Sequence, residues 1–129
     1  MLLLIKNARL VNEGVTLQSD ILIENQKIKK IAAEIAIAAD QIINAKGLYL
    51  LPGIIDSQVH FREPGLTHKG TIYSESKAAV AGGITSFMEM PNTRPQALTQ
   101  KLLENKYKIA SKKSIANYSF FMGVSNDNI

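Results

Sequence analysis

From residue 54 onward the chain repeats one pattern, and this repeat constrains its fold more than any other feature. Strand-like runs at 54–60, 84–90 and 117–124 alternate with helical segments at 71–83 and 97–113. Buried parallel strands have nearly continuous apolar sequences, and helices connect them across the faces of the sheet. The pattern therefore predicts an α/β fold with a parallel sheet.

The residues before this repeat have a different character. Short β-like runs with polar breaks predict a meander or a small sandwich; they are LLLIKNARLV, DILIE, KIKKIA, QIINA and LYLL. The pair Asn25-Gln26 lies between two alternating runs, as a two-residue hairpin turn would. The Ala-rich segment 32–40 has no clean helical stripe, so we expect an irregular connection there.

A change of pattern divides the chain. The turn-forming pair Pro52-Gly53 follows the last β-like run and precedes the first strand of the βα repeat. We therefore expect a β-rich N-terminal domain over residues 1–51 and a βα domain over residues 52–129.

Composition and length exclude several classes of protein. With 129 residues, 46% of them hydrophobic, the chain has the composition of a soluble globular protein with a real core. The apolar run at 2–5 is too short for a signal sequence or a membrane span. The absence of Cys excludes disulfides and thiolate metal sites and fits a cytoplasmic location. Although the net charge is +4, the lysines are dispersed without interleaved aromatic residues, so we do not expect nucleic-acid binding. We expect the lysines between 101 and 113 on the solvated face of a helix.

Polar side chains follow two neighbouring strands of the predicted sheet. His60, Arg62 and Glu63 come after the first strand, and Asn92 comes after the second. The carboxyl ends of parallel strands meet at one rim of the sheet, where ligands gather. Plainer interpretations stay open, because His60 alone is typical of a hydrogen-bonded rim histidine, Arg62 and Glu63 could form a solvated pair, and Asn92 after a proline is a common turn former.

The motifs at these positions carry a resemblance to a known family. LPGIID, then DSQVHFREPG, AAVAGGIT and finally MPNT resemble the start of the dihydroorotase family, in the cyclic amidohydrolase superfamily, over nearly the whole chain. Hydantoinases and dihydropyrimidinases share the PGxID-x-H-x-H beginning but usually lack REPG, and allantoinases tend to carry Asn where Arg62 stands here. The resemblance implies a small N-terminal β-sandwich-like domain followed by the first strands and helices of a metallo-dependent hydrolase (β/α)8 barrel. Because such a barrel needs about 250 residues, we expect a truncated one here.

The resemblance also implies a function. Family members interconvert N-carbamoyl-aspartate and dihydroorotate in pyrimidine biosynthesis, using a divalent metal, expected to be zinc, as one or two ions. It assigns His60 to the metal, and it assigns Arg62 and Asn92 to the substrate carboxylate, for which a planar guanidinium is well suited. The carboxylated Lys, two further His ligands and the catalytic Asp come from later strands, so we expect the catalytic residues beyond Ile129. The partners implied are a small-molecule substrate and a homodimer or an assembly of the pyrimidine pathway.

One position departs from the family pattern. Gln58 stands where the family usually has the first His of an H-x-H pair, and an amide oxygen is a weak, neutral metal ligand. Three interpretations remain open: a lineage that tolerates Gln, a catalytically silent homologue that serves as an interaction module, and a changed metal preference. An allantoinase-like or hydantoinase-like enzyme is a further alternative. Asp56 either lies near the metals or caps backbone amides, and we expect His68 at the surface.

Overall fold

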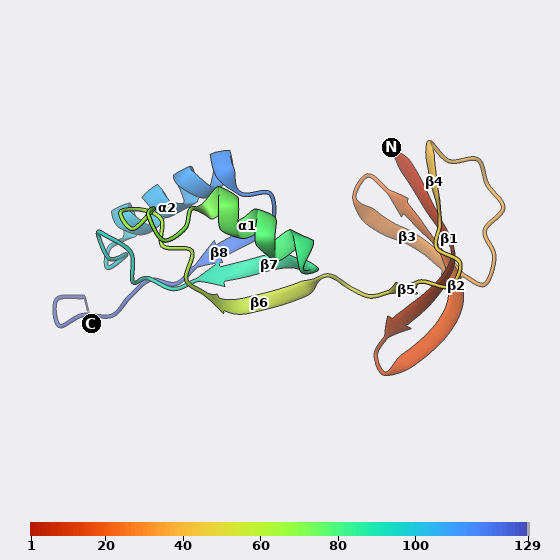
Figure 1. Ribbon diagram of the computed structural model, residues 1–129, viewed down its shortest axis with the longest axis horizontal. Coiled ribbons are helices and arrows are strands. Elements are labelled where there is room, and N and C mark those ends of the chain that lie inside the picture. Colours follow the sequence, from red (N-terminus) through yellow and green to blue (C-terminus); the bar gives the residue numbers. More distant parts are fainter. Residues whose placement is uncertain (129) are drawn as a thin grey trace. The chain divides into compact units, whose positions relative to one another are not determined.

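The computed structural model describes residues 1–128 (Figure 1). The chain forms two compact units, the first over Met1–Pro52 and the second from Gly53 onward. The elements are β1 (Leu2–Asn12), β2 (Val15–Glu24), β3 (Lys27–Ala32), β4 (Gln41–Asn44), β5 (Tyr49–Leu50), β6 (Ile54–Val59), α1 (Ile72–Ala81), β7 (Ile84–Glu89), α2 (Gln100–Lys113) and β8 (Asn117–Phe120).

The first unit is built on an antiparallel meander of β1, β2 and β3. Asn25 and Gln26 form the turn between β2 and β3 with φ of 48° and 69°, the left-handed conformation of a two-residue hairpin. β4 and β5 then pair with β1 in parallel, which the sequence pattern did not indicate. These five strands form one sheet, so the meander interpretation fits the described residues better than a sandwich of two sheets.

A buried carboxylate organises this sheet. The register of β1 shifts between Ile5 and Ala8, and in that irregular stretch Asn7 donates its backbone N–H to Asp20 Oδ1 at 2.8 Å. The other oxygen of Asp20 accepts the N–H of Ile35 at 2.9 Å, which anchors the irregular Ala-rich connection to the sheet. The N–H of Asn7, helped by that of Ile35 and by the charge of Lys6, lowers the pKa of the Asp20 carboxyl against the opposing effect of burial.

The second unit confirms the predicted α/β architecture. β6, β7 and β8 form a parallel sheet in chain order, and α1 and α2 lie on the same face of it (Figure 1). The apolar core lies between the sheet and the two helices and contains Val59, Phe61, Ile72, Phe87, Ala110 and Phe120. The strand–helix–strand repeat read from the sequence is therefore the repeat that the chain forms.

Local signals set the ends of the helices. Thr71 caps α1 and forms a capping box with Ser74, and the helix ends at Gly82. The second helix begins at Gln100, a few residues later than the expected 97, because the Thr99 side chain accepts the N–H of Leu102 and so caps the helix there. Neither of these helices is long and apolar enough to cross a membrane.

Candidate functional site

Exposed and buried side chains alternate at the end of β6 and in the two residues that follow it. Val59 and Phe61 are each 8% exposed and pack in the core below the helices. Gln58 and His60, which flank Val59, are exposed. Because successive side chains of a strand point to opposite faces, Gln58 and His60 share the face of the sheet that α1 and α2 leave open.

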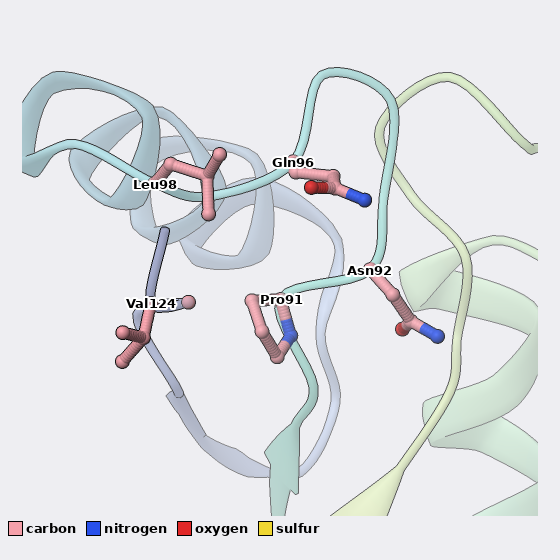
Figure 2. Close-up of a pocket in the computed structure, with 6 residues that line it drawn as sticks. Pro91, Asn92, Gln96, Leu98 and Val124 are labelled. Atoms are coloured by element: carbon pink, nitrogen blue, oxygen red, sulfur yellow. The ribbon is translucent and has the colours of Figure 1, made fainter. Parts of the chain in front are cut away.

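His60 meets a residue of the second loop. Its Nδ1 lies 3.0 Å from Oδ1 of Asn92, so the structure brings these two candidate residues together. An amide oxygen only accepts hydrogen bonds, so the contact fits the tautomer with the proton on Nδ1, in which Nε2 has the lone pair. Figure 2 shows the Asn92 side chain turned away from Leu98 and Val124. The contact leaves the Asn92 amide nitrogen as a donor and the His60 Nε2 as an acceptor or metal ligand.

Arg62 has an unusual backbone. Its φ is +72°, in the left-handed region that residues other than glycine rarely adopt. The backbone N–H donates to Oε1 of Glu89 at 2.9 Å, and the backbone carbonyl accepts the N–H of Leu66 at 3.0 Å. Among residues 1–128 the guanidinium takes part in no ion pair, so this charged group remains available to an anionic ligand.

Glu89 belongs to a buried ion pair that our sequence analysis missed. Glu89 is 0% exposed and its Oε2 lies 3.0 Å from Nζ of Lys106, which is 1% exposed. The two charged groups therefore form a close ion pair in the interior of the second unit. Burial raises the pKa of the Glu89 carboxyl and lowers the pKa of the Lys106 ammonium, while their mutual attraction opposes both shifts.

Lys106 corrects one interpretation and shows which signal was available. The lysines between 101 and 113 were expected on a solvated helix face, but Lys106 is buried on α2. It follows Leu103 by three residues and precedes Ala110 by four, so it lies on the apolar stripe of the helix. A charged residue in that stripe indicates a buried partner, and Glu89, the charged residue of β7, is that partner.

Glu63 does not form a solvated pair with Arg62, because its carboxylate is buried and has other partners. Oε2 accepts the N–H of Ile72 at 2.9 Å, at the first residue of α1, and Oε1 pairs with Lys113. A carboxylate at a helix N-terminus is stabilised by the unpaired N–H groups and the helix dipole. Glu63 therefore fixes the loop after β6 to the start of α1.

The two loops that carry the candidate residues are packed directly against each other. Arg94 donates its backbone N–H to the carbonyl of Pro64 at 3.1 Å. Gly65 has a φ of +82°, and a Cβ added there would lie 2.0 Å from the backbone oxygen of Arg94. This close approach fixes the spacing between the loop that holds Arg62 and the loop that holds Asn92.

A small, mostly apolar pocket of about 160 Å³ lies beside Asn92, toward Leu98 and Val124 (Figure 2). Its lining residues are Pro91, Asn92, Gln96, Leu98, Gly123 and Val124. His60 and Arg62 are not among them, so this pocket is separate from the polar group formed around His60.

The described residues do not by themselves form a metal centre. Within residues 1–128, three or more His, Cys, Asp or Glu side chains nowhere lie close enough together to hold an ion. Asp56 accepts the backbone N–H of Gln58 at 3.0 Å, as a backbone cap does, and His68 is exposed in its loop. A single imidazole is not the full ligand set of a divalent ion.

Comparison with known sequences identifies relatives of the chain. Residues 49–125 match the model of the amidohydrolase family. The chain is 49% identical over 117 residues to a dihydroorotase of Lactococcus lactis subsp. lactis, a match that covers 89% of the chain and 28% of that relative. It is 42% identical over 124 residues to a dihydroorotase of Methanosarcina acetivorans, covering 95% and 27%. The chain thus spans about 28% of the length of a relative it matches.

Solved structures give a related result. An L-hydantoinase (dihydropyrimidinase) from Arthrobacter aurescens superposes with a TM-score of 0.94 at 30% identity, covering 98% of this chain and 28% of that one. A dihydropyrimidinase from Brevibacillus agri NCHU1002 superposes with a TM-score of 0.85 at 30% identity, with the same coverage of both chains. The fold of the chain is therefore that of the corresponding part of these enzymes.

Proposed function

The chain belongs to the amidohydrolase family, and from this premise we propose that it forms the N-terminal part of a dihydroorotase. The whole protein would interconvert N-carbamoyl-aspartate and dihydroorotate in pyrimidine biosynthesis. The observation that carries the proposal is the 3.0 Å contact between His60 and Asn92, because it joins the HFREPG and MPNT loops. The higher sequence identity to dihydroorotases than to the solved hydantoinases supports the same choice.

We assign the substrate carboxylate to Arg62 and Asn92. The guanidinium of Arg62 is a permanent cation with paired N–H donors, which match the two oxygens of a carboxylate. Asn92 uses its amide oxygen on His60, so its amide nitrogen is the group that would donate to the ligand. A carboxylate distinguishes dihydroorotate from hydantoin and dihydrouracil, so these two donors would determine substrate choice.

Amidohydrolases are metal-dependent generally, and we propose zinc, as one or two ions, for the whole protein. His60 would supply one ligand through Nε2, since its other ring nitrogen is held by Asn92. Because Gln58 offers only a neutral amide oxygen, the remaining ligands and the catalytic residues would have to come from outside this chain.

A hydantoinase-like function is the second candidate. The observation that favours it is the close superposition on an L-hydantoinase. Hydantoin has no carboxylate for Arg62 to bind, so a hydantoinase would leave the guanidinium without a substrate role. For that reason we place dihydroorotase first.

Substrate choice and the role of Arg62 can be tested together. The full-length protein should hydrolyse dihydroorotate faster than hydantoin or dihydrouracil, whereas the isolated 129-residue chain with added zinc should show no turnover. Arg62→Lys should raise the KM for dihydroorotate roughly tenfold or more, since an ammonium lacks the paired donors. The matched control is Arg94→Lys, an exposed arginine on the neighbouring loop, which should leave the KM unchanged.

Three results would contradict the proposal. Faster hydrolysis of hydantoin would favour the second candidate. Absence of turnover with all three substrates would favour a silent homologue that acts as an interaction module. Turnover by the isolated chain would show that its own residues complete the site.

For the whole protein we propose a cytoplasmic location and a small-molecule substrate, either as a homodimer or within a pyrimidine-pathway assembly. The absence of Cys supports a reducing compartment. Size-exclusion chromatography with light scattering would measure the oligomeric state.

A further inference from the structure

We propose that Glu89 is a positioning residue for Arg62, and that Lys106 holds Glu89 in the place from which it acts. This inference rests on the proposed function, because it takes Arg62 as the group that binds the substrate carboxylate. Glu89 would act through the backbone of Arg62 and would not touch the substrate itself.

The first observation is the contact between the two residues. Oε1 of Glu89 accepts the backbone N–H of Arg62 at 2.9 Å. Arg62 has a φ of +72°, a conformation that residues other than glycine seldom adopt. The direction in which the Arg62 side chain leaves the backbone depends on this φ, so an acceptor that holds its N–H also aims its guanidinium.

The second observation is how firmly Glu89 itself is held. Glu89 is the last residue of β7, is 0% exposed, and has its backbone carbonyl bonded to the N–H of Phe121 at 3.0 Å. Nζ of Lys106 lies 3.0 Å from Oε2 and also donates to the carbonyl of Met90 at 3.0 Å. The two carboxylate oxygens therefore have separate partners, since Oε2 faces the lysine and Oε1 faces Arg62.

An ion pair that only stabilised the fold would respond differently to substitution. Buried ion pairs can often be replaced by apolar side chains of similar size without loss of stability. An apolar replacement here would satisfy the packing, yet it could not accept the N–H of Arg62. The consequence of removing the acceptor should therefore appear in substrate binding rather than in folding.

Two double variants of the full-length protein separate these roles. Replacing Glu89 alone would leave the Lys106 charge buried without a partner, so both residues are changed together. Glu89→Gln with Lys106→Met keeps an oxygen that can accept the N–H of Arg62, whereas Glu89→Leu with Lys106→Met removes it. Both lack the ion pair, so the Gln double variant is the matched control for the Leu double variant.

We expect the KM for dihydroorotate to remain within about threefold of wild type in the Gln double variant and to rise roughly tenfold or more in the Leu double variant. The urea midpoints of the two variants should agree. In an Arg62→Ala background the difference in KM between them should disappear, because Glu89 would then have no arginine side chain to aim. Equal KM values in the two double variants, or a difference that persists without Arg62, would overturn the proposal.

Amide hydrogen exchange of Arg62 gives a readout that does not depend on the reaction. Its N–H should exchange slowly in wild type and in the Gln double variant, and much faster in the Leu double variant. If the protein does not turn over dihydroorotate, the proposed function fails, and exchange alone decides whether Glu89 holds Arg62. Equal protection in the two double variants would overturn the positioning role in that case.

Discussion

Replacing Gly65 with Ala tests whether contact between the two loops fixes the geometry of the candidate site. Gly65 has a φ of +82°, which costs an L side chain about 1–2 kcal/mol. The added Cβ would lie 2.0 Å from the backbone oxygen of Arg94, whereas ordinary contacts begin at 3.4 Å. The Arg94 loop would therefore have to retreat, and overpacking of this kind costs about 1–3 kcal/mol more.

Gly83→Ala is the matched control in the same unit. Gly83 has a φ of +88°, but nothing lies within 4 Å of an added Cβ, so this variant incurs only the conformational cost. In urea unfolding we expect Gly83→Ala to lower the free energy of unfolding by about 1–2 kcal/mol and Gly65→Ala by about 2–5 kcal/mol. Only Gly65→Ala should also raise the KM for dihydroorotate, because only that change moves Asn92 away from Arg62.

Equal losses of stability in the two variants would refute the reasoning, since they would mean that the loop contact adds nothing to the conformational cost. A KM for Gly65→Ala that matches wild type would refute the link between loop spacing and substrate binding. The two measurements thus separate an error about packing from an error about the site.

Two further predictions concern single side chains. In the full-length protein His60→Ala should abolish turnover and reduce the bound metal, whereas Gln58→Ala should reduce both much less and Gln58→His should raise the metal affinity. Metal content and turnover measure these effects. Equal losses in the two Ala variants would show that Gln58 is a working ligand. The pKa of Asp20 is lowered in the folded state, so its contribution to stability is fully present above its unfolded pKa of about 3.9 and is lost as pH falls through the lower folded value. Thermal unfolding between about pH 6 and 2 should therefore show an acid-dependent loss in wild type that is smaller in Asp20→Asn, and identical pH profiles would contradict the assignment.

Local patterns in the sequence determined the repeat of strands and helices. The apolar runs of the second unit became β6, β7 and β8, and the two helices bury one face of the parallel sheet that these strands form. The polar residues that follow β6 and β7 came together as His60 and Asn92, since the carboxyl ends of parallel strands meet at one rim. The hairpin turn at Asn25-Gln26 likewise follows from its spacing between two alternating runs.

Tertiary structure alone decided which buried polar groups meet. Contacts between residues distant in sequence could not be read from local patterns. Examples are the pairing of β4 and β5 with β1, the two backbone contacts of Asp20, and the contacts that link Lys106 to Glu89 and Glu89 to Arg62. The hydrophobic periodicity of the sequence indicates whether a side chain is buried, but it does not identify the residue that the side chain contacts. A buried charge must have one, and which group supplies it depends on how the helices and loops pack over the sheet.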